Sequence, residues 1–285
     1  MSRILSRLSQ TSPWLDKAAG TLKTISTPIV GPDAPKPLKD VLYGVWLGHP
    51  LHPSMTDIPV GSWTMTAVFD LAGQERAADT ALKIGVLGAL GSAVTGIAQW
   101  YDLQEEEEPR RLGALHASLN TAALGLYLAS WRMRANGDRE AGVATALAGY
   151  AIAGTSAWIG GHLSFALGIG VSRNAFEQPP AKWRTALPEA ELVDGQLTKV
   201  EVRGSQVLLL KQGDRIHATS NICTHVGGPL NEGELDGTCV TCPWHGSEFD
   251  LRDGSVVHGP ATNHLTTYET RVSDGNVQIR ARQDM

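Results

Sequence analysis

Two short segments near the C-terminal end carry residues whose types and spacing indicate metal chemistry. The first holds Cys223 and His225, and the second holds Cys242 and His245. Each segment supplies one thiolate and one imidazole, and the hairpin-length stretch between them lets the two segments face each other. Such a set suits an iron–sulfur cluster with two cysteines on one iron and two histidines on the other. A structural zinc ion is the competing interpretation.

The sequence around these pairs resembles Rieske [2Fe–2S] ferredoxins and the Rieske domains of ring-hydroxylating oxygenases. The resemblance covers roughly residues 187–283 and rests on the runs CTHVGGPLNEGELDG, CPWHGSEFD and GSVVHGPA. It implies a [2Fe–2S] cluster and disfavours zinc. The implied cluster ligands are Cys223, His225, Cys242 and His245.

The resemblance also implies roles for residues that bind no iron. Gly259 and Pro260 match the family's third loop, which shields the cluster. Ser247 keeps a hydroxyl that tunes the cluster in high-potential members, whereas Phe249 stands where those members have tyrosine. Hydrogen bonds to sulfur stabilise the reduced cluster, so we expect an intermediate-to-low potential.

Rieske proteins of cytochrome bc complexes carry an additional cysteine in each cluster loop, and the two form a disulfide. Here Gly228 and Trp244 occupy those places, so that disulfide is not expected. Cys239, the third cysteine, is predicted to be a small buried residue in a strand.

The rest of this region predicts a small antiparallel β sandwich or barrel. Short β-rich runs alternate with turns containing Gly, Asp and Ser. These runs cover residues 200–202, 206–210, 215–219, 265–272 and 277–281.

The preceding part of the chain contains four mainly apolar segments, each long enough to cross a bilayer as a helix. Their spans are 54–72, 84–101, 112–131 and 143–171. The second and third contain no Asp, Glu, Lys or Arg, which disfavours a soluble bundle with a polar stripe. We therefore predict a four-helix transmembrane bundle followed by the β domain. We find no internal repeat or low-complexity tract.

Three motifs in this region resemble an uncharacterised bacterial family of four-helix membrane domains, the domain of unknown function 2231. They are GHPLHP at 48–53, IPVG at 58–61 and GGHL at 160–163. The resemblance spans about residues 45–171 and implies no established activity.

Four histidines of this region are expected near one membrane face, because successive helices alternate in direction. They are His49, His52, His116 and His162. Ionisable groups within a membrane usually face a bundle interior and serve a function. A haem b site, a quinone or metal pocket, and purely structural roles all remain open.

The chain is accordingly divided into four parts: an N-terminal segment 1–44, a transmembrane domain 45–171, a linker 172–186 and a Rieske domain 187–283. Residues 3–30 are compatible with amphipathic helices on the membrane surface, with Trp14, Leu15 and Leu22 toward lipid.

Lysines and arginines favour a cytoplasmic location for the histidine face, on a multi-pass protein of the cell's inner membrane. The start of the chain shows no apolar signal segment. The flanks of the histidine face carry Arg3, Arg7, Lys17, Lys23, Lys36, Lys39, Arg110, Arg111, Arg173, Lys182 and Arg184; those of the other face carry Arg76, Lys83, Arg132, Arg134 and Arg139.

These features predict a membrane-anchored carrier of single electrons between a cytoplasmic donor and a membrane acceptor, either haem or quinone. Its partners would be a reductase or oxidase, and membrane lipid. The alternatives are a subunit of a quinone oxidoreductase and a redox-sensing subunit. No oxygenase-type mononuclear iron domain is expected after the Rieske region, which disfavours an enzyme acting alone. The net charge of −5 gives no indication of nucleic-acid binding, and three cysteines suit a reducing compartment.

Overall fold

The chain folds into two compact units, one of helices and one of β-sheet. The computed structural model describes residues 5, 10, 12–103 and 106–282. The helical unit comprises residues 1–38 and 50–169, and the β unit comprises residues 39–49 and 170–285. The predicted order of an α-helical domain followed by an antiparallel β domain is confirmed.

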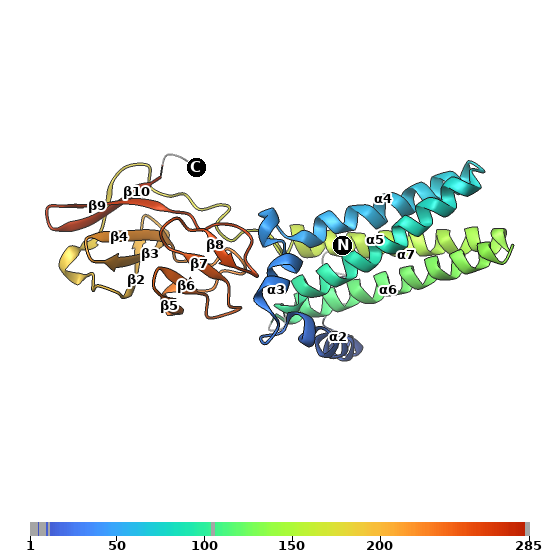
Figure 1. Ribbon diagram of the computed structural model, residues 1–285, viewed down its shortest axis with the longest axis horizontal. Coiled ribbons are helices and arrows are strands. Elements are labelled where there is room, and N and C mark those ends of the chain that lie inside the picture. The colour runs from blue at the N-terminus through green and yellow to red at the C-terminus, as the bar shows by residue number, and fades with distance from the viewer. Residues whose placement is uncertain (1–4, 6–9, 11, 104–105, 283–285) are drawn as a thin grey trace. The chain divides into compact units, whose positions relative to one another are not determined.

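Four long helices lie alongside one another in the helical unit (Figure 1). They are α4 (Leu51–Leu71), α5 (Glu75–Tyr101), α6 (Glu107–Ala135) and α7 (Arg139–Phe165). Each overlaps one of the four predicted apolar segments. The last helix ends at Phe165 and does not reach residue 171, because Gly168 and Gly170 adopt positive φ angles of 70° and 79° that interrupt a helix.

Two helices in the described part of the chain, α5 and α7, are long and apolar enough to cross a membrane by length and composition. The other two are less uniform. Helix α6 has Arg110 and Arg111 in its second turn and Arg132 and Arg134 in its last. Helix α4 contains Pro59 in its interior.

The four helices form two equivalent hairpins, α4–α5 and α6–α7. Helices α5 and α7 both contain 27 residues, and their ends are offset by the same 64 positions. The motif Leu-His-x-Ser starts at Leu51 and recurs at Leu115, and Ser-Ala-x-x-Gly starts at Ser92 and recurs at Ser156. This internal repeat corrects the expectation that the sequence has none; its identical positions are too scattered to be recognised without the helix boundaries.

Repeat-related residues face each other between the hairpins. The rings of Trp63 and Tyr127 stack with centroids 4.0 Å apart and planes 9° apart. A Cβ atom at Gly85 would lie 2.3 Å from the Trp63 ring, and one at Gly149 would lie 3.2 Å from the Tyr127 ring. The two glycines therefore have the same packing role in each hairpin, where a helix backbone receives an aromatic ring.

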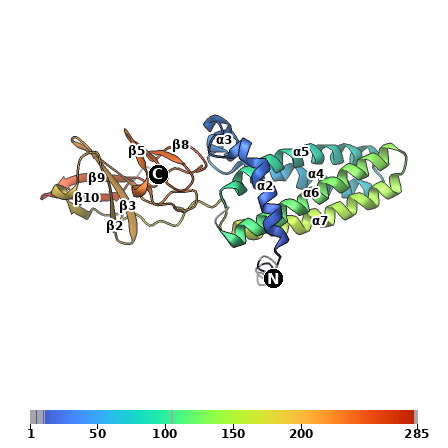
Figure 2. The same ribbon diagram turned by 90° about the horizontal axis from the view of Figure 1, so that it is seen from below.

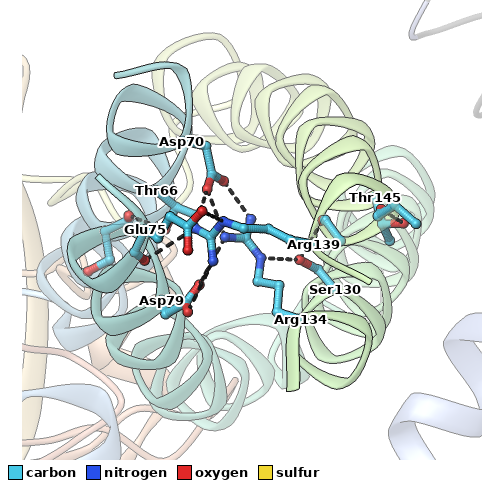
Figure 3. A network of polar contacts seen from close by, with 11 residues as sticks. Thr66, Asp70, Glu75, Asp79, Ser130, Arg134, Arg139 and Thr145 are labelled. Atoms are coloured by element: carbon cyan, nitrogen blue, oxygen red, sulfur yellow. Dashed lines mark hydrogen bonds and ion pairs between the residues drawn. The ribbon is translucent and has the colours of Figure 1, made fainter. Parts of the chain in front are cut away.

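A second repeat-related pair, Asp70 and Arg134, lies at the end of the bundle where α4 meets α5. Arg134 Nη1 donates to Asp70 Oδ1 at 2.8 Å, and these side chains are 1% and 4% exposed. Asp79 and Arg139 extend the network, so that all four helices contribute (Figure 3). Buried charges of this kind require partners, and here the network ties the helix ends together.

Helix α2 (Trp14–Val30) crosses the bundle and packs against α5 and α6 (Figure 2). Leu15 is 1% exposed, and Asp16 pairs with Arg110 and Arg111 of α6. The expectation that Leu15 faces lipid is therefore wrong, because the helix uses that side chain to pack on protein. The part of the predicted amphipathic segment before residue 12, apart from Leu5 and Gln10, lies outside the described residues. Helix α3 covers Lys36–Tyr43.

The β unit contains three antiparallel sheets. The first has the strand order β1–β10–β9, the second β2–β3–β4 and the third β5–β6–β7–β8. The strands are β1 (Arg184–Pro188), β2 (Leu197–Val202), β3 (Ser205–Gln212), β4 (Arg215–Ser220), β5 (Glu234–Asp236), β6 (Cys239–Thr241), β7 (Glu248–Asp250), β8 (Val256–His258), β9 (Tyr268–Ser273) and β10 (Asn276–Ala281).

Strand β3 contributes side chains to both hydrophobic cores of this unit. Val207 and Leu209 point into one core, while Leu208 and Leu210 point into the other, and all four are at most 1% exposed. Alternate residues of a strand face opposite sides, so a continuous apolar run fills both. The second core also contains Cys223 and Cys242, which places the candidate metal ligands at the edge of packed structure.

Candidate functional site

The first cluster loop follows strand β4 and is closed by its own backbone. Cys223 N–H donates to Gly228 O at 2.9 Å, and Gly227 N–H donates to Cys223 O at 3.0 Å. Gly227 has a φ of 94°, a conformation that favours glycine. Asn221 holds the base of the loop, since its Oδ1 accepts from Asn231 N–H at 2.9 Å. This frame positions Cys223 and His225 on the loop.

The second loop joins β6 to β7 and is closed by backbone hydrogen bonds in the same way. Cys242 N–H donates to Ser247 O at 2.8 Å, and Gly246 N–H donates to Cys242 O at 3.1 Å. Gly246 has a φ of 75°. Each loop therefore turns tightly behind its cysteine and presents a histidine at its tip.

The structure brings the four predicted ligand residues together. The rings of His225 and His245 lie with centroids 5.1 Å apart and planes perpendicular. Cys223 and Cys242 are 1% and 3% exposed, and their thiols are hydrogen-bonded to each other. Two thiols thus lie on the buried side of the site and two imidazoles on its outer side.

The electrostatics of the site suit metal ligation. The hydrogen bond from Cys223 lowers the pKa of Cys242 to about 7, although burial acts to raise it, so a thiolate is accessible near neutral pH. The same pairing raises the pKa of Cys223. Burial and then His245 lower the pKa of His225 to about 3, which keeps that ring neutral and its nitrogen lone pair available.

The arrangement also bears on the number of metal ions. Among residues 5, 10, 12–103 and 106–282, no three His, Cys, Asp or Glu side chains converge on a single point. A lone tetrahedral zinc ion would need all four ligands around it. A Rieske cluster needs only two ligands on each of two irons, and the pairing of thiol with thiol and imidazole with imidazole suits it.

Gly228 lies against the cysteine of the second loop. A Cβ atom there would be 2.7 Å from Cys242 Sγ and 3.2 Å from the Trp244 ring. Gly228 and Trp244, which stand where the disulfide cysteines would be, therefore lie next to each other. Cys223, Cys239 and Cys242 are all free. Cys239 lies in β6 as predicted but is only half-buried.

Ser247 connects the second loop to the third. Its side chain is fully buried, its Oγ accepts from Ala261 N–H at 3.0 Å, and it is hydrogen-bonded to the Cys223 thiol. Gly259 and Pro260 precede Ala261 in this third loop. Phe249 is fully buried in the adjoining core.

A contact that the sequence did not predict involves Asp40, which belongs to the β unit although it precedes the four long helices in the chain. Asp40 Oδ1 accepts from Gly259 N–H at 2.9 Å, and its Oδ2 lies 2.7 Å from His258 Nδ1. Asn263 Nδ2 donates to Gly48 O at 3.2 Å. Residues 39–49 therefore hold the third loop from outside; no local sequence signal indicates a pairing over more than 200 residues.

The helical unit brings together two of its predicted histidines. The rings of His52 on α4 and His116 on α6 have centroids 6.5 Å apart. His162 lies half-buried in the last turn of α7. His49 belongs to the β unit and is exposed. The expected cluster of four is thus a pair with two other residues placed separately.

Comparison with protein families identifies both parts of the chain. Residues 182–269 match the Rieske [2Fe-2S] domain, and residues 48–173 match the predicted membrane protein family DUF2231. The chain belongs to the Rieske [2Fe-2S] domain family, fused to a DUF2231 domain. A Rieske domain implies a [2Fe–2S] cluster.

Several known proteins are similar to about a third of this chain. The ferredoxin component of the naphthalene 1,2-dioxygenase system from Pseudomonas putida is 31% identical over 98 residues, covering 34% of this chain and 94% of that protein. Apoptosis-inducing factor 3 from Mus musculus is 35% identical over 91 residues, covering 32% of this chain and 15% of that protein. Among solved structures, the Sphingomonas yanoikuyae B1 ferredoxin is 27% identical with a TM-score of 0.34, covering 35% of this chain and all of that one.

Proposed function

We propose that this protein is a membrane-anchored Rieske iron–sulfur protein that carries single electrons between a cytoplasmic donor and a membrane acceptor. The observation that carries the proposal is the meeting of two closed loops, each with one cysteine and one histidine. In this proposal Cys223 and Cys242 hold one iron, and His225 and His245 hold the other.

When bound, the cluster exchanges one electron at a time. The chain contributes the environment for that exchange. Burial of the two thiols keeps water from the sulfur side of the site. The hydroxyl of Ser247 offers a hydrogen bond on that side, and the backbone of both loops fixes ligand positions before the cluster is reduced. A rigid, prearranged shell keeps reorganisation small.

The outer side of the site is suited to a partner protein. His245 is half-buried, and its neighbour Trp244 is 55% exposed. An exposed aromatic ring beside an imidazole ligand is a favourable contact point at a protein interface. We expect the donor to be a redox protein such as a reductase, because one relative is a ferredoxin component of a dioxygenase system.

The helical unit supports membrane anchoring through the character of its surface. Large apolar side chains on all four helices point outward and are between 37% and 70% exposed. An apolar surface of this extent is unfavourable in water and favourable in lipid. The side chains are Ile58, Val60, Met65 and Val68 on α4; Ile84, Leu87, Leu90 and Val94 on α5; Leu128 and Trp131 on α6; and Leu147, Tyr150 and Trp158 on α7.

The interior of the bundle is, by contrast, rich in small and hydroxyl residues. Ser92, Ser130 and Ser156 are buried, and their hydroxyls donate to backbone carbonyls of neighbouring helices. Close helix packing through small residues and interhelical hydrogen bonds is typical of helices in lipid. We therefore propose a multi-pass inner-membrane domain in which all four helices cross.

The proposed orientation places the histidine end of the bundle in the cytoplasm. Flanking lysines and arginines are more numerous at that end. Ion pairs neutralise basic residues at both ends: Arg110 and Arg111 bind Asp16 at the histidine end, and Arg134 binds Asp70 at the other. The histidine end therefore keeps its excess of lysine and arginine.

Two measurements test the proposal. Membranes from cells producing the full chain should retain it after alkaline extraction, and detergent should release it. The cluster of the purified protein should then be reduced by one electron per chain and be reoxidised by a soluble quinone or by haem. Release at alkaline pH without detergent, or the absence of any one-electron couple after reconstitution with iron and sulfide, would overturn it.

A further inference from the structure

A pair of repeat-related histidines lies toward the N-terminal ends of α4 and α6. His52 and His116 occupy equivalent positions in the two hairpins, 64 residues apart in sequence. Their ring centroids are 6.5 Å apart and their planes are perpendicular. Each ring comes from a different hairpin, so the pair bridges the interface between the repeats.

Each imidazole makes the same kind of hydrogen bond, to a serine carbonyl on the other helix of its own hairpin. His52 Nδ1 lies 3.0 Å from Ser92 O on α5, and His116 Nδ1 lies 2.8 Å from Ser156 O on α7. A carbonyl oxygen can only accept, so each Nδ1 must carry the hydrogen. In the neutral ring the second nitrogen, Nε2, then keeps its lone pair. Histidines that bind metals usually have their other nitrogen anchored to a carbonyl in this way.

This protonation state separates the ligand classes. A quinone carbonyl would need a hydrogen-bond donor, which the Nε2 atoms of His52 and His116 are not when Nδ1 is the protonated nitrogen. A metal ion needs a lone pair. Asn120 Nδ2 lies 3.0 Å from His116 Nε2, which is consistent with an accepting nitrogen there.

The ring spacing also fits a metal. Two bonds of about 2.0–2.1 Å from opposite imidazoles to one ion place the ring centroids roughly 6 Å apart. The measured 6.5 Å is close to this value. In the part of the chain that the structure describes, no third His, Cys, Asp or Glu joins the pair. The pair thus supplies two ligands, whereas a bare zinc ion would need four.

Haem iron is the metal for which two protein ligands suffice, because the porphyrin supplies the others. We propose that His52 and His116 are the two axial ligands of a haem b bound between the hairpins. This inference rests on the proposed function and names its membrane acceptor. In that role ferric haem gains one electron and becomes ferrous while the reduced cluster loses one.

The packing of the bundle holds each histidine ring against its own hairpin. Helices within each hairpin contact each other far more extensively than helices of different hairpins. Near the histidines this close contact depends on Gly96 and Gly160. A Cβ atom on these glycines would lie 2.7 Å and 3.0 Å from the Cε1 atoms of His52 and His116, respectively. The rings therefore sit against the helix backbones of their own hairpins.

Asn120 is the group that haem would displace. It lies one turn beyond His116 on the same helix, so a rotation of its side chain frees Nε2 without moving the backbone. Replacing it should not remove the site. Asn120→Ala is therefore expected to bind haem as the natural chain does.

The test is the absorption spectrum of the full chain, purified in detergent from cells supplied with a haem precursor and then titrated with ferric protoporphyrin IX. We expect a six-coordinate low-spin spectrum with one haem per chain. His52→Ala and His116→Ala should each lose it, whereas the control His162→Ala should keep it. His116→Met should retain haem with a shifted spectrum and a raised potential, since Met/His ligation raises it.

The cluster signal serves as the folding control in each variant, because it arises from the other unit. Size-exclusion elution in detergent reports the state of the helical unit. Failure of the natural chain to bind protoporphyrin, or retention of low-spin haem in His52→Ala and His116→Ala, would overturn the inference. A Rieske signal without haem would refute this inference alone, whereas haem without a Rieske signal would refute the proposed carrier function alone.

Discussion

Asp40 holds the third cluster loop through both carboxylate oxygens. One oxygen accepts from Gly259 N–H at 2.9 Å, and the other lies 2.7 Å from His258 Nδ1. Val45 adds to this contact, because a Cβ atom on Gly259 would lie 3.0 Å from its side chain. A segment that precedes all four long helices in the chain thus becomes part of the Rieske unit.

Asp40→Ala should loosen the third loop and speed loss of the cluster. Hydrogen bonds to charged groups contribute about 1.5–3 kcal/mol each, so the loss of stability should be of this order. Asp40→Asn is the matched control: it keeps an oxygen for Gly259 N–H but loses the charge beside His258, and should be intermediate. Thermal bleaching of the cluster absorption measures both. Equal bleaching temperatures in all three proteins would show that the contact has no structural role.

Ser247→Ala should lower the reduction potential of the cluster. The buried hydroxyl is hydrogen-bonded to Cys223, and such bonds favour the more negative, reduced state. Loss of about 1 kcal/mol of this preference corresponds to about 40 mV for one electron. A redox titration followed by visible circular dichroism gives the value. Phe249→Tyr should shift the potential upward, and a shift of Ser247→Ala in that same direction would contradict the assignment.

Asp70→Asn should destabilise the helical bundle. It leaves Arg134, 4% exposed, with Asp79 as the remaining carboxylate of the pair shown in Figure 3. Breaking a buried pair by removing one partner costs about 3–5 kcal/mol, and the second carboxylate should reduce this to about 2–4 kcal/mol. Asp79→Asn is the control, since that side chain is 35% exposed and should matter less. Thermal unfolding in detergent ranks the two, and the reverse order would refute the network's proposed role.

Glu177→Gln should stabilise the β unit at neutral pH. Burial raises the pKa of Glu177 above its ordinary value, although Ser220 Oγ donates to Oε1 at 2.6 Å. The folded state therefore binds more protons than the unfolded state, and stability falls as pH rises through the folded pKa. Glutamine keeps the accepting oxygen and removes the charge.

The gain should be below about 1 kcal/mol, because the side chain is partly solvated. It should shrink markedly near pH 4, where the carboxyl is largely protonated in both states. Melting temperatures at pH 4 and pH 7 test this, with the exposed Glu201→Gln as the control. A gain at pH 4 equal to that at pH 7 would exclude the charge as its cause.

Features with a fixed local spacing could be predicted from the sequence. The two cluster loops and the strands around them follow from cysteine and histidine spacing and from period-two patterns. The four apolar segments likewise predicted the four long helices, because apolar composition is a local property. The end of α7 was missed, since two glycines break the helix while the apolar pattern continues.

Features that depend on distant pairing could not be predicted. In the sequence, nothing distinguishes Asp40 from another charged residue of a short amphipathic helix. Only the fold places it beside Gly259. The repeat was missed because functionally equivalent positions differ in type, as with Trp63 and Tyr127 or the oppositely charged Asp70 and Arg134. A comparison of residue types at fixed offset around His52 and His116 is the signal that would have found it.

The central claim is a histidine-ligated [2Fe–2S] cluster held by Cys223, His225, Cys242 and His245. Electron paramagnetic resonance of the dithionite-reduced full chain, purified in detergent after labelling its histidines with nitrogen-15, tests it most directly. We expect a rhombic Rieske spectrum in which two histidine nitrogens couple to the cluster. A signal without histidine coupling, or no signal after reconstitution with iron and sulfide, would contradict the account.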